Sequence, residues 1–130
     1  MLILTVRTDK PEAEVGLFNN EKELAYKKWQ AHKQLSETIH KKIDSLLEQQ
    51  SSEWGDIAGV VAYSGPGSFT GLRIGISLVN ALGESQGIPI VGATGDNWIN
   101  QGLEKLKLGK NDKIIIPDYG RPARTTSPRK

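Results

Sequence analysis

The first thirty residues alternate between apolar and polar side chains as short β-strands do. Residues 2–6 (LILTV) form a β-rich run, and the alternation continues on both sides of a turn signal at residues 19–21 (NNE). Residues 10–12 (KPE) supply another turn signal. The pattern therefore predicts three short antiparallel strands that end near Trp29.

From residue 35 the apolar positions follow the period of a helix, which predicts an amphipathic helix over residues 35–47. Residues 57–63 (IAGVVAY) form an apolar run of strand length, typical of a central strand that is covered on both faces. Residues 88–92 (IPIVG) form a second such strand. The helical segment between these strands predicts a parallel pair with a right-handed crossover.

The helix predicted over residues 72–86 is apolar on two sides. The first stripe contains Leu72, Ile76 and Val79, and the second contains Ile74, Leu78 and Ala81 or Leu82. One sheet covers only one side of a helix, so the other side needs another helix or another chain. The spacing leaves open which stripe meets the sheet.

A third helix is predicted over residues 96–106, and residues 113–116 are a candidate edge strand that Pro117 and the following turn residues stop. The fold class is therefore α/β, with a mixed five-stranded sheet of three antiparallel and two parallel strands and helices packed on it. We expect one lobe over residues 1–109 and a basic, flexible C-terminal tail over residues 110–130.

Composition supports one folded domain. The 130 residues are 37% hydrophobic and 25% charged, with 17 Lys and Arg against 15 Asp and Glu. The longest uncharged stretch is broken by Pro66 and several glycines, and the N-terminus does not resemble a secretory signal, so we expect a cytoplasmic protein.

The absence of cysteine excludes disulfides and thiolate metal sites. His32 and His40 lie on different sides of a helix, so no metal site is expected.

The glycine-rich segment between the predicted strand and helix is the most informative stretch for chemistry, because backbone N–H groups there can hold an anion. Its glycine spacing does not match the dinucleotide-binding fingerprint, and the Lys that a Walker loop needs after its last glycine is absent. Phe69 stands where a nucleophile elbow has Ser. The alternative is close packing, since glycines recur every fourth residue and allow another backbone to approach. The weak candidates for an anion loop are Gly65, Gly67, Ser68, Thr70 and Gly71, and the packing series is Gly67, Gly71 and Gly75.

General acid–base catalysis has few candidates in this sequence. Asp9, Asp56 and Asp96 lie near predicted strand ends, but turn residues flank the first two and the third can cap a helix. The pattern therefore favours a structural role for each of the three carboxylates.

Residues 64–75 (SGPGSFTGLRIG), followed by residues 87–92 (GIPIVG), resemble the bacterial TsaB (YeaZ) family. This family is the dimerisation subunit of the complex that installs threonylcarbamoyl on adenosine 37 of tRNA. The resemblance covers about residues 1–107. It implies an actin-like, ribonuclease-H-like fold, no catalytic residues or cofactor, pairing with the catalytic subunit TsaD through helices, and a TsaE ATPase in the assembly.

The sequence departs from the family at two places. Arg7 stands where the family has an acid after the first strand, which argues against metal-nucleotide binding through that loop. The family has two lobes and this sequence has one, so the resemblance implies a shortened form.

Residues 110–130 carry a net charge of +4, whereas residues 1–109 carry a net charge of −2. One hypothesis is that the tail touches tRNA phosphates, and the alternative is a solvated tail. The basic candidates are Arg121, Arg124, Arg129 and Lys130.

The sequence thus predicts a noncatalytic scaffold that pairs with a TsaD-like chain, or with a second copy when that chain is absent. The candidate interface residues are Leu35, Ile39, Ile43, Leu72, Ile76 and Val79, with Ile74 and Leu78 as alternatives. The competing hypothesis is a small nucleotide-binding hydrolase or glycoprotease-like enzyme that uses the loop of residues 65–71. A stand-alone tRNA-binding module is disfavoured because the body is slightly acidic and the tryptophans are dispersed.

Overall fold

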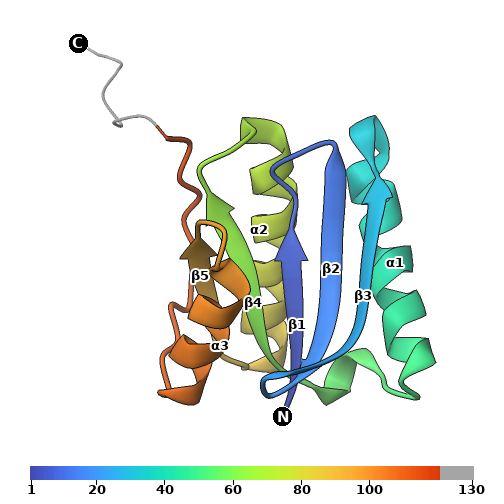
Figure 1. Ribbon diagram of the computed structural model, residues 1–130, viewed down its shortest axis with the longest axis vertical. Coiled ribbons are helices and arrows are strands. Elements are labelled where there is room, and N and C mark those ends of the chain that lie inside the picture. Colours follow the sequence, from blue (N-terminus) through green and yellow to red (C-terminus); the bar gives the residue numbers. More distant parts are fainter. Residues whose placement is uncertain (121–130) are drawn as a thin grey trace.

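A computed structural model describes residues 1–120. Five strands form one sheet in the order β3-β2-β1-β4-β5 (Figure 1). The strands are β1 (Leu2–Arg7), β2 (Glu12–Asn19), β3 (Lys22–Gln30), β4 (Ile57–Gly65) and β5 (Ile90–Thr94). The helices are α1 (Leu35–Gln49), α2 (Phe69–Gln86) and α3 (Trp98–Lys107), with short 3-10 helices at His32–Gln34 and Trp54–Asp56.

The strand directions confirm the predicted mixed sheet. β1 and β2 are antiparallel, as are β2 and β3, whereas β4 is parallel to both β1 and β5. Both crossovers pass through helices, which is what parallel neighbours require. The predicted fold class, an α/β lobe with a mixed five-stranded sheet, is therefore correct.

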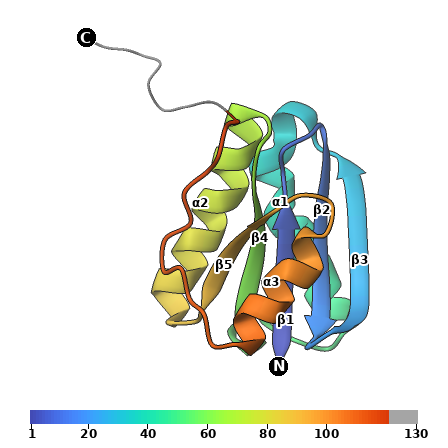
Figure 2. The ribbon, with the colours of Figure 1, turned by 60° about the vertical axis from the view of Figure 1, so that its left-hand side comes forward.

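Two layers of helices cover the sheet unequally (Figure 2). α1 packs on β2 and β3 and α2 packs on β4 and β1, on one face, whereas α3 packs on β5 and β4 on the other face. β4 is therefore covered on both sides, as its unbroken apolar run predicts. Leu4, Val60 and Ile90, which face α1 and α2, are fully buried.

The structure decides between the two stripes of α2. Leu72, Ile76 and Val79 face the sheet and are at most 3% exposed. Ile74 and Leu78 lie on the opposite side of the helix, beside α1, and are only partly buried. The sheet thus covers the first stripe, and α1 covers part of the second.

The edge strand predicted over residues 113–116 does not form. Lys113 has a φ of 65°, in the left-handed region, which breaks an extended backbone. The backbone N–H of Ile115 donates to Oδ1 of Asn80 at 2.8 Å, and Nδ2 of Asn80 donates to the Ile115 carbonyl at 3.1 Å. A side-chain amide on α2 therefore takes the place of a neighbouring strand.

The first part of the predicted tail contacts the lobe at individual side chains. Ile115 is 4% exposed, and the ring of Tyr119 lies 4.6 Å from the ring of Phe69. Ile115 and Tyr119, two residues of the predicted tail, therefore contact the lobe. No helix within residues 1–120 is long and apolar enough to cross a membrane.

Candidate functional site

The glycine-rich turn joins β4 to α2 at the carboxyl end of the parallel strands. The packing series on α2 faces the turn between β1 and β2, because a Cβ at Gly71 would overlap the carbonyl oxygen of Thr8 and one at Gly75 would overlap its side chain. Thr8 Oγ1 donates a hydrogen bond of 2.7 Å to the Gly71 carbonyl. A Cβ at Gly67 would likewise overlap Asp9. The four-residue repeat is therefore confirmed as a close-packing device.

The same turn is covered by the chain itself. The backbone N–H of Asp118 donates to the Ser64 carbonyl at 2.7 Å, and the Asp118 carbonyl occupies the space that a Cβ at Gly65 would need. The carboxylate of Asp9 lies against Gly67, and the backbone N–H of Ser68 donates to the Asp9 carbonyl at 3.2 Å. The structure brings the anion-loop candidates together, but places a carboxylate of the chain beside them, which disfavours a bound anion.

A buried ion pair occupies the end of β1. Nε of Arg7 lies 2.8 Å from Oδ1 of Asp9 and Nη2 lies 3.2 Å from Oδ2, and the two side chains are 13% and 6% exposed. The Arg7 guanidinium also lies 3.9 Å from the centre of the Tyr63 ring. At the position where the resemblance leads one to expect an acid, the chain therefore has a cation that neutralises its own Asp9.

The pKa values at this end of the sheet follow from burial and from that ion pair. Burial alone lowers the pKa of Arg7, but the hydrogen bond and charge of Asp9 outweigh it, so the pKa of the guanidinium is raised. Burial, and then the charge of Asp9, raise the pKa of Tyr63 above its ordinary value. The Tyr63 hydroxyl therefore keeps its proton and donates it to the Pro66 carbonyl at 2.8 Å, which fixes the glycine turn.

The other carboxylate candidates are structural or exposed. Oδ2 of Asp56 accepts a hydrogen bond of 2.8 Å from the Glu53 backbone and caps a 3-10 helix. The N-cap of α3 is Asn97 and not Asp96, so the predicted capping residue is wrong by one position. Within residues 1–120, no three His, Cys, Asp or Glu side chains lie close enough together to hold a metal ion.

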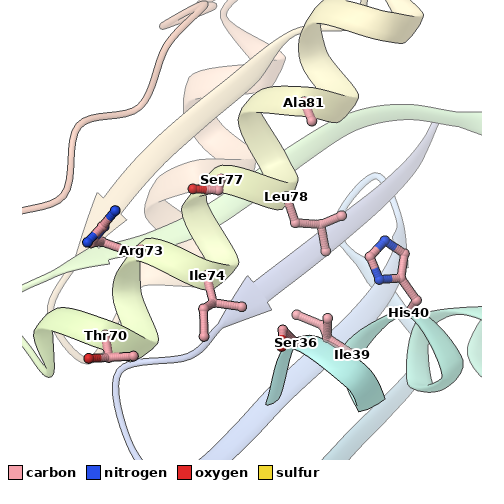
Figure 3. A pocket seen from close by; sticks show the side chains of 9 residues that line it. All are labelled: Ser36, Ile39, His40, Thr70, Arg73, Ile74, Ser77, Leu78 and Ala81. Carbon is pink, nitrogen blue, oxygen red and sulfur yellow. The ribbon is translucent and has the colours of Figure 1, made fainter. Parts of the chain in front are cut away.

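An open groove with an apolar strip lies between α1 and α2 on the helical face (Figure 3). It has a volume of about 580 Å³. The side chains of Ile74 and Leu78 on α2 and Ile39 on α1 form its apolar part, whereas Thr70 and Arg73 lie at one end, near the glycine turn. The other lining residues are Ser36, His40, Ser77 and Ala81. Small and polar side chains around an apolar strip leave room for a helix of another chain.

Of the six residues first named for a partner interface, Ile39 lines the groove and the other five do not. All are buried in the core of the lobe: Leu35 5%, Ile39 1%, Ile43 0%, Leu72 0%, Ile76 3% and Val79 0% exposed. They form the sides of α1 and α2 that pack on the sheet, so that assignment is corrected in favour of the alternative residues Ile74 and Leu78. The tRNA-contact candidates Arg121, Arg124, Arg129 and Lys130 lie outside the described residues.

Sequence reasoning also missed residues that shape the site. Asn80 tethers the segment after α3, and Thr8 anchors the glycine series. An amide in the middle of an otherwise apolar helix was a usable signal, because a partly buried amide needs hydrogen-bond partners. Thr8 gave no such signal, since its partner lies 63 residues away in the chain.

The lobe has the fold of solved actin-like and ribonuclease-H-like proteins. YeaZ from Pseudomonas aeruginosa is 20% identical with a TM-score of 0.66, and a protein with similarity to peptidase YeaZ from the same organism gives 20% and 0.67. Each alignment covers 72% of this chain and 43% of that chain. RuvC from Thermus thermophilus is 11% identical with a TM-score of 0.50, covering 95% of this chain and 86% of RuvC. These identities establish a shared fold, and no match was found among curated proteins.

The family follows from residues 29–94, which match the family described as TsaD: tRNA N6-adenosine threonylcarbamoyltransferase. The matched region runs from the end of β3 through α1, the glycine turn and α2 to the end of β5, and makes up half of the chain. The chain therefore belongs to this family, with a YeaZ-like fold, as its sequence resemblance predicts. It spans 43% of the length of the YeaZ structures that it matches.

Proposed function

We propose that this chain is a noncatalytic, cytoplasmic subunit that supports threonylcarbamoyl transfer to adenosine 37 of tRNA by pairing with a TsaD-like catalytic chain. The contact surface is the helical face around the groove between α1 and α2. The observation that carries the proposal is the half-open position of Ile74 and Leu78, which the lobe itself covers only in part. Membership of the family supplies the reaction.

The shape of the helical face supports pairing through helices. α1 and α2 lie side by side on one face of the sheet, and the groove between them presents an apolar strip (Figure 3). Two helices of a partner placed against this face would complete a four-helix arrangement. A standard interface buries roughly 800 Å² per partner, and its apolar centre would fall on Ile74 and Leu78.

The region around the glycine turn and the end of β1 supports a role without catalysis. Arg7 and Asp9 are paired with each other, and the glycine turn packs against Thr8 and Asp118. Groups that act on a substrate have to reach it in a cleft, whereas these groups are engaged within the lobe. A TsaE-like ATPase in the assembly, a homodimer of the isolated chain and tRNA contacts by the basic tail belong to the same proposal.

Co-expression with a TsaD-type chain, followed by measurement of the size of the complex, tests the proposal directly. Ile74→Glu and Leu78→Glu should each weaken pairing roughly 100-fold, because a carboxylate would be buried in an apolar interface. Each variant should keep the fold, since the substituted side chain is only partly buried in the free lobe.

Leu108→Glu is the matched control. Leu108 follows α3 on the other face of the sheet, is 64% exposed and receives the same change of side chain. It should pair normally. Equal loss of pairing in all three variants, or undiminished pairing by Ile74→Glu and Leu78→Glu, would remove the groove from the proposal.

A further inference from the structure

We propose that residues 111–118 form an edge guard, a built-in segment that closes the outer edge of β5 to strand addition, so that the lobe associates through its helical face. The inference deepens the proposed function, because it names the surface that a partner is prevented from using. β5 is an end strand of the sheet, and the outer edge of such a strand can pair with a strand of another chain.

Two residues of the guard take up the outward backbone groups of the first half of β5. Oδ1 of Asn111 accepts from the Ile90 backbone N–H at 3.1 Å, and the backbone N–H of Asp112 donates to the Ile90 carbonyl at 2.8 Å. Oδ2 of Asp112 accepts from the Gly92 backbone N–H at 2.8 Å. Three successive outward groups are therefore already bonded, and one carboxylate takes the place of a strand carbonyl.

Two side chains of α3 complete the closure. Nζ of Lys105 donates to the Gly92 carbonyl at 2.8 Å, and Oε1 of Gln101 accepts from the Thr94 backbone N–H at 3.1 Å. The outward groups of β5 alternate with those that face β4, so these contacts continue the series from Ile90 to Thr94. An incoming strand would have to break five hydrogen bonds before it formed its own.

The guard does not offer a replacement edge. The left-handed φ of Lys113 interrupts the extended backbone, and Pro117 has no N–H to donate. Ile115 is buried and its backbone is held by Asn80. The exposed side chains of Ile114 and Ile116, at 68% and 78%, therefore stand on a segment that cannot present a regular ladder to another strand.

Amide hydrogen exchange and sedimentation of the full chain test the guard. The experiment uses Asp112→Ala in the Ile74→Glu background, so that pairing through the helical face does not contribute. Exchange at the Gly92 amide should become about tenfold faster, since a hydrogen bond to a charged group is lost. The variant should also associate as its concentration rises, with slow exchange returning at Gly92 in the associated form.

Three further variants keep the test decisive. Asp112→Asn retains an acceptor oxygen and should stay close to the parent, and Lys110→Ala alters an exposed side chain that precedes the guard and should change nothing. If Asp112→Ala fails to fold, Asn111→Ala frees the Ile90 amide, together with the Lys113 amide within the guard, and should give a smaller increase in exchange at Ile90.

Unchanged exchange at Gly92, or an Asp112→Ala protein that stays monomeric at its highest soluble concentration, would overturn the guard. Association that leaves the β5 amides exchanging rapidly would also overturn it, because another surface would then be responsible. Asp112→Ala with Ile74 intact should still bind the TsaD-type chain. That binding tests the proposed function separately.

Discussion

The glycine turn precedes α2 and the groove runs along α2 beside α1, yet the rest of the chain covers the turn and leaves the groove open. The turn carries the most distinctive sequence of the protein, and its surface is filled by Thr8, Asp9 and Asp118. The groove carries a plain pattern of Ile, Leu and Ser, and it stays open. A conspicuous motif here specifies how the chain packs on itself, and an ordinary stripe supplies the surface that we propose for another chain.

The largest expected effect breaks the packing at the turn. Gly71→Ala should lower the free energy of unfolding by about 3 kcal/mol, because the new methyl group overlaps a backbone carbonyl that cannot move without shifting the β1–β2 turn. Urea unfolding measures this. Gly55→Ala, where the added methyl group meets nothing within 4 Å, should stay within about 0.5 kcal/mol of the parent. A similar, small effect for both would contradict the packing assignment.

The next effect separates the two stripes of α2. Leu72→Ala should lower the free energy of unfolding by about 2–5 kcal/mol, as a fully buried leucine does. Ile74→Ala should cost less stability, since its side chain is partly exposed, but should weaken binding to a TsaD-type chain. Paired measurements of unfolding and binding on both variants check the distinction. Equal stability losses would mean that both stripes belong to the core.

The ion pair at the end of β1 should contribute less than the core. Asp9→Asn removes the charge opposite the buried Arg7 guanidinium and should lower the free energy of unfolding by about 2 kcal/mol. Asp96→Asn, at an exposed position, is the control. Binding through the groove should be the same in both variants. An effect of Asp9→Asn on pairing alone would instead place Asp9 in the interface.

Alkaline pH should lower the stability of the fold through the glycine turn and should leave the groove unchanged. The pKa of Tyr63 is raised in the folded state, so the folded state holds the hydroxyl proton more tightly than the unfolded state does. The protonated Tyr63 hydroxyl therefore makes its full contribution to stability below the unfolded pKa of about 10. This contribution is lost as pH rises through the higher folded pKa. Thermal unfolding from pH 8 to 11 should show a smaller alkaline loss in Tyr63→Phe than in the parent. An unaltered alkaline loss would argue against the assignment.

The smallest expected effect is no binding at the glycine turn. Titration of the isolated chain with ATP or inorganic phosphate should release no heat, because Asp9 and the Asp118 backbone already occupy that region. Saturable heat that disappears in a Ser68→Pro variant would favour the nucleotide-binding enzyme, the competing hypothesis. Heat without saturation would leave the scaffold proposal intact.

Much of the fold could be predicted because its signals are local. The alternation before Trp29, the helical period from Leu35 and the apolar run from Ile57 each reflect burial of elements on their neighbours. The three strands, the helix and the central strand that they predict all form. The strand expected over residues 113–116 failed for a non-local reason. Asn80, more than thirty residues earlier, binds the backbone that a strand would use.

The sequence by itself determined the order of the elements, the type of sheet and the presence of a second apolar stripe on α2, since these depend on the spacing of side chains within one segment. Only the tertiary structure decided that Leu72 faces the sheet and Ile74 the groove, that Thr8 meets Gly71, and that Asp112 closes β5. The physical reason is that such contacts depend on how distant segments are placed in register. A hydrophobic period fixes which residues share a face, whereas packing in three dimensions fixes what each face meets.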